Sequence, residues 1–225
     1  MGDFIGLLDL IFPSRCIICR QLLNGNVPIH ICSKCITEVE FYNKDIVPLS
    51  LGGGIRSYCD GVVCVGKYQH SLKKALRDYK FNDRPSFYRA FGELIADKIN
   101  RVLIQYPLDV IVPVPMSRKR KAQRGYNQAA LIATKASQIL SVPLDARSII
   151  KVKDTLRQSS LGRQERLTNL NDAFQVLSTY PYLGKTVVLI DDIITTGSTL
   201  NECSKALKAA GAKYVFGAVI ATTRE

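Results

Sequence analysis

A hydroxyl-rich turn that follows two adjacent acids has the most specific chemistry in this chain. The segment runs from the apolar 187–190, through Asp191 and Asp192, to Thr195, Thr196, Gly197, Ser198 and Thr199. Between a strand and a helix, such a turn aims backbone amides and hydroxyls at one point, and the helix N-terminus adds partial positive charge. Gly197 lets the backbone approach a ligand closely, and Ser198 or Thr199 is placed to cap the helix. The segment therefore predicts a cradle for a phosphate monoester.

The two acids need a separate explanation, because carboxylates repel a phosphate unless something lies between them. Ribose hydroxyls or a hydrated Mg²⁺ are suitable mediators, since both interact well with carboxylate oxygens. Neighbouring side chains on a strand point to opposite faces, so we expect the strand to end at Asp191 and Asp192, where a turn lets both reach one ligand. The alternative interpretation is a plain strand-to-helix loop with solvated acids and a helix cap.

Four of the seven cysteines form two CxxC pairs, namely Cys16 with Cys19 and Cys32 with Cys35. The twelve residues between the pairs allow two tight turns of thiolates to close on one tetrahedral zinc ion. A module of about thirty residues buries too little apolar area to fold unaided, so the metal would supply most of its folding free energy. Four sulfur ligands leave no position for a substrate, so the zinc is predicted to be structural. The alternative is a set of unligated core cysteines.

The other three cysteines are scattered along the sequence. An odd number of cysteines cannot all be paired, which argues against a disulfide framework and for a reducing compartment. The apolar N-terminal stretch is short and contains Asp3 and Asp9, so it does not resemble a secretory signal. A membrane span needs about eighteen apolar residues in a row, and the sequence has no such run. We therefore expect a cytoplasmic protein without a membrane span.

The composition fits a folded protein whose partners are anionic. The chain has 225 residues, of which 47% are hydrophobic and 22% charged, which excludes disorder and a disulfide mini-scaffold. Its 31 basic and 19 acidic residues give a formal net charge of +12 at pH 7. Such a charge favours phosphorylated small molecules, nucleic acid or a membrane surface as partners, without choosing among them.

Alternating strand and helix patterns begin near residue 60 and indicate how the turn is positioned. Apolar runs predict strands at 110–114, 148–152, 187–190 and 215–220, and apolar residues at helical spacing predict helices over 87–103, 129–140 and 199–210. The last two strand runs are almost continuously apolar, as in parallel strands covered on both faces. The pattern predicts an α/β domain with a mostly parallel sheet flanked by helices over 59–225. A zinc-binding module over 1–47 and a linker over 48–58 precede it.

The acid-rich turn resembles the PRPP-binding motif of type I phosphoribosyltransferases. Resemblance to one branch, the ComF family of competence-associated proteins, covers nearly the whole chain. Two features that carry it lie at the ends of the chain: the four-Cys module, which is double zinc ribbon-like, and the Asp-Asp turn. The others lie between them, and they are Tyr68, residues 72–81, residues 112–115, Arg120, the run Arg124-Gly125-Tyr126-Asn127-Gln128, Arg157-Gln158, Arg163, Arg166, Asn169 and Ala173-Phe174.

This resemblance implies roles for particular residues. Asp191 and Asp192 would hold the ribose hydroxyls of Mg²⁺-bound PRPP, and 195–199 would hold its 5′-phosphate. The pyrophosphate loop would consist of Pro115, Met116, Ser117, Arg118, Arg120 and Arg124. Arg157, in a segment that closes over the substrate in the superfamily, would contact the leaving group and act in catalysis with the two acids. The alternative for the basic residues after Val114 is a solvated positive face.

The resemblance also implies a function in DNA uptake and natural transformation, with phosphoribosyl transfer to an unknown acceptor. Because the sequence stops soon after its last strand, we expect any cover over the acceptor to come from the region before Pro107, such as 68–84, or from the zinc module. Two alternatives remain open. One is a non-catalytic, PRPP-regulated protein that binds single-stranded DNA, and the other is a scaffold whose zinc module docks other DNA-uptake proteins.

Overall fold

A four-stranded parallel sheet lies at the centre of the computed structural model, which describes residues 14–23, 30–52, 54–81, 84–152, 173–177 and 182–224. The strand order is β1-β6-β5-β2, and every neighbouring pair is parallel. The strands are β1 (Gly61–Lys67), β2 (Val110–Pro113), β5 (Thr186–Ile194) and β6 (Tyr214–Thr222). The predicted α/β class with a mostly parallel sheet flanked by helices is confirmed. The two apolar runs predicted to be covered on both faces are the two central strands.

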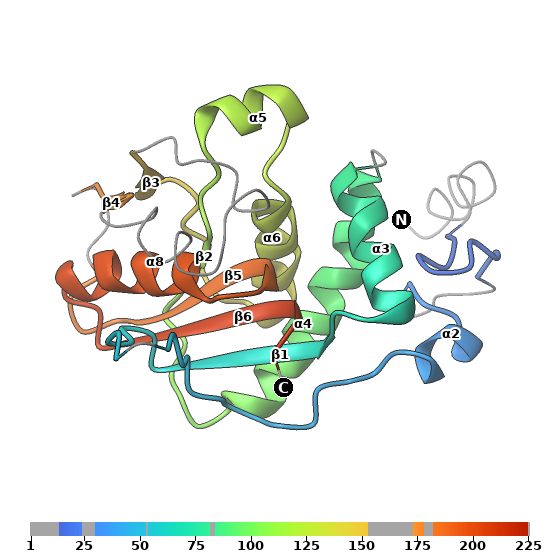
Figure 1. Cartoon of the computed structure of the whole chain (residues 1–225), viewed down its shortest axis with the longest axis horizontal. Helices are drawn as coiled ribbons and strands as arrows, with labels where there is room; N and C mark the ends of the chain where they lie inside the picture. The colour runs from blue at the N-terminus through green and yellow to red at the C-terminus, as the bar shows by residue number, and fades with distance from the viewer. Residues whose placement is uncertain are drawn as a thin grey trace.

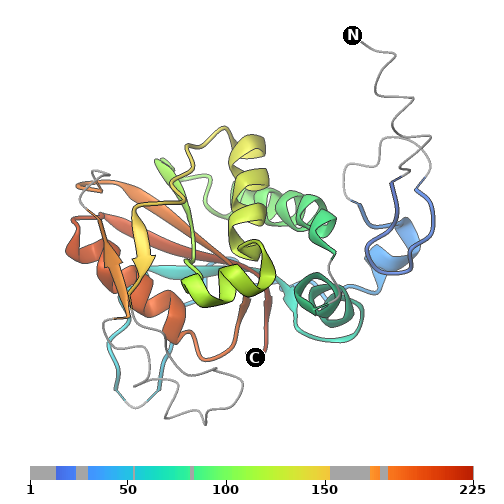
Figure 2. The same ribbon diagram turned by 90° about the horizontal axis from the view of Figure 1, so that it is seen from above.

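Helices cover both faces of this sheet (Figure 1). The helices α4 (Tyr88–Val102) and α6 (Gln128–Leu140) pack on one face, and α8 (Ser198–Ala209) packs on the other, as the view from above shows (Figure 2). The three predicted helices are thus confirmed to within two residues at each end. The chain also forms α3 (His70–Phe81) and the 3₁₀ turn η1 (Pro85–Phe87), which the periodicity did not predict.

The predicted strand over 148–152 forms outside the main sheet. It appears as β3 (Ile149–Lys151), which pairs antiparallel with β4 (Phe174–Val176) in a separate two-stranded sheet. The buried Asp145 fixes the chain just before β3, because its carboxylate accepts hydrogen bonds from the backbone N–H of Arg147 and Ser148, both at 3.0 Å, and from the Tyr182 hydroxyl at 2.5 Å. These bonds turn the chain away from β2, and residues 149–151 therefore do not join the main sheet.

The strand β5 does not end at the two acids, as the sequence had suggested. It continues through Asp191 and Asp192 to Ile194, and its pairing with β6 keeps one register as far as the pair Ile194 and Thr222. The expectation was wrong because β6 is equally long and supplies hydrogen-bond partners past the acids. The two carboxylates therefore lie on opposite faces of the strand.

The N-terminal cysteine segment, with α2 (Ser33–Thr37), lies beside α3 in both views (Figure 1 and Figure 2). Cys16, Ile17 and Ile31 belong to the same apolar cluster as the buried faces of α3 and α4. Two polar contacts join the same surfaces: Arg20 pairs with Asp78 at 2.5 Å, and the His30 ring contacts Glu93 at 3.1 Å. The segment is therefore packed against the core of the larger domain.

The segment predicted as a linker also packs against the core. Leu49 and Leu51 are each 3% exposed, and Val47 forms an isolated antiparallel bridge with Val62 of β1. The division into 1–47, 48–58 and 59–225 stays a prediction.

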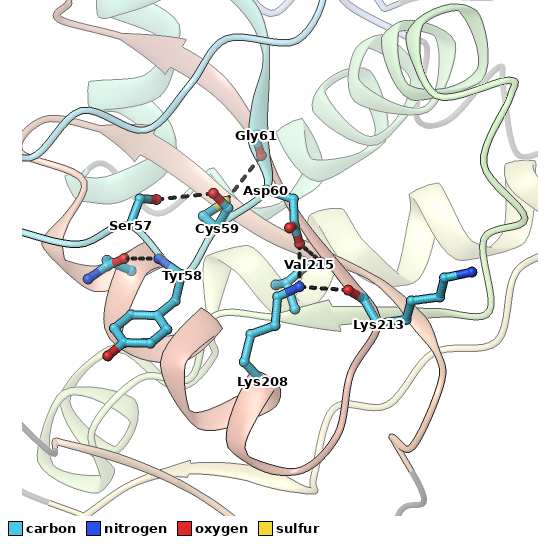
Figure 3. A network of polar contacts seen from close by, with 9 residues as sticks. Ser57, Tyr58, Cys59, Asp60, Gly61, Lys208, Lys213 and Val215 are labelled. Carbon is cyan, nitrogen blue, oxygen red and sulfur yellow. Dashed lines mark hydrogen bonds and ion pairs between the residues drawn. The ribbon is translucent and has the colours of Figure 1, made fainter.

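Polar contacts fix the last residues before β1 (Figure 3). The backbone N–H of Tyr58 donates to the Asn201 side chain on α8 at 2.8 Å. The Asp60 carboxylate accepts from the Val215 N–H at 2.6 Å and pairs with Lys208 at 2.7 Å. The chain thus enters β1 already bound to α8 and β6. Within the described ranges, no helix combines the length and the apolar composition that a membrane crossing requires.

Candidate functional site

A cavity of about 530 Å³ opens at the carboxyl ends of β2 and β5, the edge at which α/β sheets bind ligands. Seven segments of the chain line it: Tyr68, the end of α3, the residues after β2, the start of α6, Lys151 of β3, Phe174 of β4, and the end of β5 with the turn that follows. The fold thus brings together Asp191, Asp192, the turn 195–197 and the basic segment after β2, which lie far apart in the sequence.

The two acids line this cavity from opposite faces of β5. Asp192 lies on the side of α3, where its Oδ1 pairs with the Lys80 ammonium at 2.8 Å. Asp191 alternates with it toward α8, and its Oδ1 accepts the backbone N–H of Asp192 at 2.9 Å. Both can still meet one ligand, because the cavity surrounds the end of the strand.

The electrostatics of Asp191 favour an incoming cation or hydroxyl group. Burial, together with the adjacent Asp192 carboxylate, raises the pKa of Asp191 to about 7, although Lys80 and the Asp192 N–H act in the opposite direction. Any positive charge or hydrogen-bond donor that approaches Asp191 favours its ionised form and lowers this pKa. The site is therefore poised to couple ligand binding to loss of a proton.

The predicted phosphate turn has the expected left-handed glycine. Gly197 has φ +81° and is the N-cap residue of α8, so the cap is neither Ser198 nor Thr199. Thr195, Thr196, Gly197 and Thr199 line the cavity, whereas Ser198 is buried and its hydroxyl lies 2.9 Å from that of Thr196. A side chain at Gly197 would also collide with Leu49, whose Cδ1 lies 2.4 Å from the position of an added Cβ.

Arg224 holds this turn from behind, and no local pattern in the sequence pointed to it. Its guanidinium donates to the carbonyl oxygens of Thr195 at 2.9 Å, of Thr196, and of Ser50 at 2.7 Å. Within a planar trans peptide the N–H points opposite to the C=O, so the N–H groups of Thr196 and Gly197 are turned away from Arg224. Arg224 therefore orients the donors that a phosphate would need.

The segment predicted as the pyrophosphate loop is partly helical. Residues 118–124 form α5 (Arg118–Arg124), capped by Ser117, whose Oγ accepts the Arg120 N–H at 3.4 Å. The lining residues from this segment are Pro115, Met116, Ser117, Arg120 and Arg124. The structure places only the backbone of Arg118, at the start of α5, and Arg157 lies outside the described residues.

The cover expected from 68–84 is present in part. Tyr68, Lys80 and Phe81 line the cavity, and the Arg124 guanidinium lies 5.4 Å from the centre of the Phe81 ring. Sequence reasoning marked this region through the family resemblance but did not single out Lys80. Its pairing with Asp192 depends on how α3 packs against the sheet, and no residue spacing in the sequence predicts that packing.

The four predicted zinc ligands lie together. The sulfur atoms of Cys16, Cys19, Cys32 and Cys35 all lie within 4.8 Å of one another, and among the described residues no other group of three or more His, Cys, Asp or Glu is arranged to hold a metal ion. Burial raises the pKa of Cys16, but backbone hydrogen bonds from Cys32, Cys19 and Ile18 outweigh it and lower that pKa to about 7. Four thiol sulfurs in one cluster fit a structural zinc ion. Cys64 and Cys203 are buried in the core.

Comparison with known proteins agrees with both parts of the chain. The phosphoribosyl transferase domain family matches residues 80–225, and the double zinc ribbon family matches residues 7–46. The chain is 30% identical to competence protein F of Haemophilus influenzae, over 91% of this chain and 95% of that protein. The chain belongs to the ComF family of phosphoribosyltransferase-domain proteins.

This ComF protein is similar to two further proteins over part of its length. It is 30% identical to the DNA utilization protein YhgH of Escherichia coli, over 68% of each chain. Among solved structures it is similar to a purine phosphoribosyltransferase from Pyrococcus horikoshii, with a TM-score of 0.37 and 21% identity over 59% of this chain and 70% of that one.

The first prediction concerns zinc in this ComF protein. Cys35→Ser should abolish binding of the single zinc ion and lower the melting temperature by about 5 °C or more, because the metal stabilises the N-terminal segment. Metal content by atomic emission and a thermal melt measure both effects. Cys203→Ala is the control and should keep its zinc. A full zinc content in the Cys35→Ser protein would contradict a four-sulfur site.

The second prediction concerns Arg224. Arg224→Ala removes the donor shared by three backbone carbonyls, so affinity for a phosphate monoester such as ribose 5-phosphate should fall about tenfold. Arg224→Lys should recover part of the loss, because an ammonium can still bond one or two of the carbonyls. Calorimetry measures the affinity, and Arg101→Ala, on the exposed surface of α4, is the control. Unchanged affinity in Arg224→Ala would show that the turn keeps its shape without this clamp.

Proposed function

We propose that this ComF-family protein binds Mg²⁺-PRPP in the cavity and transfers the phosphoribosyl group to an acceptor. The observation that supports this most directly is the convergence of the acid pair, the phosphate turn and the basic segment after β2 on one cavity of about 530 Å³. Each group matches one part of PRPP, since the molecule carries ribose hydroxyls, a monoester phosphate and a pyrophosphate.

The chain's own residues divide the work in this proposal. Asp191 and Asp192 accept hydrogen bonds from the ribose hydroxyls, and the N–H groups of the turn 195–199 bind the 5′-phosphate. The bond between C1 of the ribose and the pyrophosphate oxygen breaks while the acceptor bonds to C1 and loses its proton. Arg120 and Arg124 then stabilise the charge that develops on the pyrophosphate. Arg157 remains a proposed contact to the same group.

A magnesium ion fits this site by the chemistry of its donors. Hard carboxylate oxygens suit Mg²⁺, and because burial and Asp192 raise the pKa of Asp191, a cation bound beside it would stabilise its ionised form. When bound with PRPP, the ion would neutralise phosphate charge beside the two acids. Asp191 and Asp192, directly or through water, are the residues that would hold it.

The biological setting follows from the relatives. Two of them are named competence protein F and DNA utilization protein, and we propose a role in DNA uptake and natural transformation for this chain as well. A cytoplasmic location is part of the proposal, because a reducing compartment keeps the four zinc ligands as thiols.

A second candidate function is PRPP-regulated binding of single-stranded DNA without turnover. It is favoured by cations that lie over tyrosine rings, with Arg56 5.2 Å from the centre of Tyr58 and Lys213 5.3 Å from that of Tyr214. Aromatic rings next to cations are the usual elements of single-strand binding, whose affinity falls steeply with salt. Salt-independent binding, or none at low salt, would remove this candidate.

The third prediction tests the proposed ligand. Asp191→Asn keeps the shape of the side chain but removes its charge, so affinity for Mg²⁺-PRPP should fall about tenfold or more, since hydrogen bonds to charged groups are the stronger ones. Calorimetry with the full chain measures it, and Asp97→Asn, on the exposed side of α4, is the matched control. A screen for pyrophosphate release with candidate acceptors then tests turnover. Absence of Mg²⁺-PRPP binding by the wild type would overturn the proposal.

The fourth prediction concerns pH. Burial and Asp192 raise the pKa of Asp191 to about 7, so ionised Asp191 becomes abundant only near neutral pH, and Mg²⁺-PRPP should bind more tightly as pH rises through that value. The free protein should show the opposite trend in stability, because the folded state holds this proton above the pH at which the unfolded chain releases it. Stability should therefore decrease from about pH 4 to about pH 7. Asp191→Asn should flatten both dependences, and equal slopes in the two proteins would contradict the assignment.

A further inference from the structure

The side-chain amide of Gln128 is buried and lacks hydrogen-bond partners. The residue is 2% exposed, and neither Oε1 nor Nε2 has a partner among the described residues. Most buried polar side-chain atoms in proteins are hydrogen-bonded, so an amide with both ends unpaired indicates that a partner is missing. The amide offers a donor and an acceptor side by side.

The neighbouring polar groups are already engaged elsewhere. The Tyr79 hydroxyl donates to the backbone oxygen of Gln128 at 2.9 Å. The Asn127 side chain donates to the Val114 carbonyl at 3.0 Å and accepts the Ala129 N–H at 3.1 Å. These bonds fix the backbone at the start of α6, and they leave the Gln128 amide without a hydrogen-bond partner in the part of the chain that the structure describes.

Gln128 lines the same cavity as the proposed PRPP contacts, at the start of α6. It lines the cavity together with Lys80, Phe81 and Tyr68, which come from α3 and the segment before it. In Figure 1, α3 and the upper end of α6 stand on one side of the sheet edge, and α8, which begins at the phosphate turn, runs away on the other. An acceptor that approached the ribose from the α3 side would lie against Tyr68, Phe81 and Gln128, which we call the acceptor wall.

We infer that Gln128 is a specificity-determining residue for the acceptor and selects an amide-like edge, in which an N–H donor and a C=O acceptor are neighbours, as in a lactam or a carboxamide. This inference rests on the proposed function of the cavity. The amide reaches the ligand by rotation about its side-chain torsions, and this movement breaks no hydrogen bond because the amide makes none in the described structure. Phe81, which is 69% exposed at the rim, supplies an apolar surface for a planar ligand.

The first part of the test uses stability. Gln128→Met has a similar shape but no polar atoms, and replacing an unpaired buried amide with an apolar group is neutral or stabilising. The melting temperature of the variant should therefore equal or exceed that of the wild type. A clear decrease would mean that water or protein pairs the amide, and it would overturn the inference. Tyr79→Phe, which loses a formed hydrogen bond, is the control and should melt at a lower temperature.

The second part uses two probes that differ in one donor. 2-Pyridone carries the lactam N–H and C=O, whereas 1-methyl-2-pyridone has lost the N–H. With the full chain loaded with Mg²⁺-PRPP, saturation-transfer NMR should show about tenfold tighter binding of 2-pyridone, the discrimination expected from one hydrogen bond to an unpaired amide. In Gln128→Met the two probes should bind equally. Equal binding to the wild type, or the same discrimination in the variant, would overturn the inference.

Calorimetry with Mg²⁺-PRPP separates this inference from the proposed function. Gln128→Met should bind Mg²⁺-PRPP with wild-type affinity, because the residue lies on the acceptor wall. A weakened affinity would assign Gln128 to the PRPP contacts and would overturn the acceptor assignment. If the wild type does not bind Mg²⁺-PRPP at all, the proposed function itself fails.

Discussion

The main physical constraint on this protein comes from two adjacent carboxylates. They lie near the end of a buried parallel strand, beside the candidate phosphate turn. Asp191 and Asp192 repel each other, and burial makes their charge more costly, so the pKa of Asp191 is raised. The fold places one cation close by, the Lys80 ammonium, and pairs it with Asp192 on one face of the strand. In the proposed function, Asp191 is left to a group that arrives with the ligand. Much of the surrounding structure serves to hold these charges at the rim of one cavity.

The phosphate turn depends on distant parts of the chain. Gly197 adopts its left-handed conformation against Leu49, and Arg224 joins the carbonyls of the turn to that of Ser50. The segment that leads from the zinc cluster into β1 therefore forms the back of the candidate phosphate site. The cysteine cluster is connected through packing to the acid pair, because Cys16 and its neighbours share an apolar cluster with α3, whose Lys80 pairs with Asp192.

Periodicity gave a good account of the elements and a poorer one of how they associate. The helices α4, α6 and α8 and the strands β2, β5 and β6 follow from local apolar patterns, which report what each segment buries. The sequence did not reveal that β3 leaves the main sheet, since Asp145 and Tyr182, which turn the chain there, are 37 residues apart. It also placed the end of β5 too early, because the length of a central strand depends on its neighbour β6.

The sequence by itself determined the four-cysteine cluster, the acid pair, the turn that follows it and the α/β class, because each depends on residues that are close along the chain and have a fixed spacing. Only the tertiary structure decided that Lys80 pairs with Asp192, that Arg224 holds the turn and that the buried Gln128 amide has no hydrogen-bond partner among the described residues. Those facts arise where helices and chain ends dock against the sheet. Such contacts join residues from separate elements, and no local pattern encodes which side chains will meet.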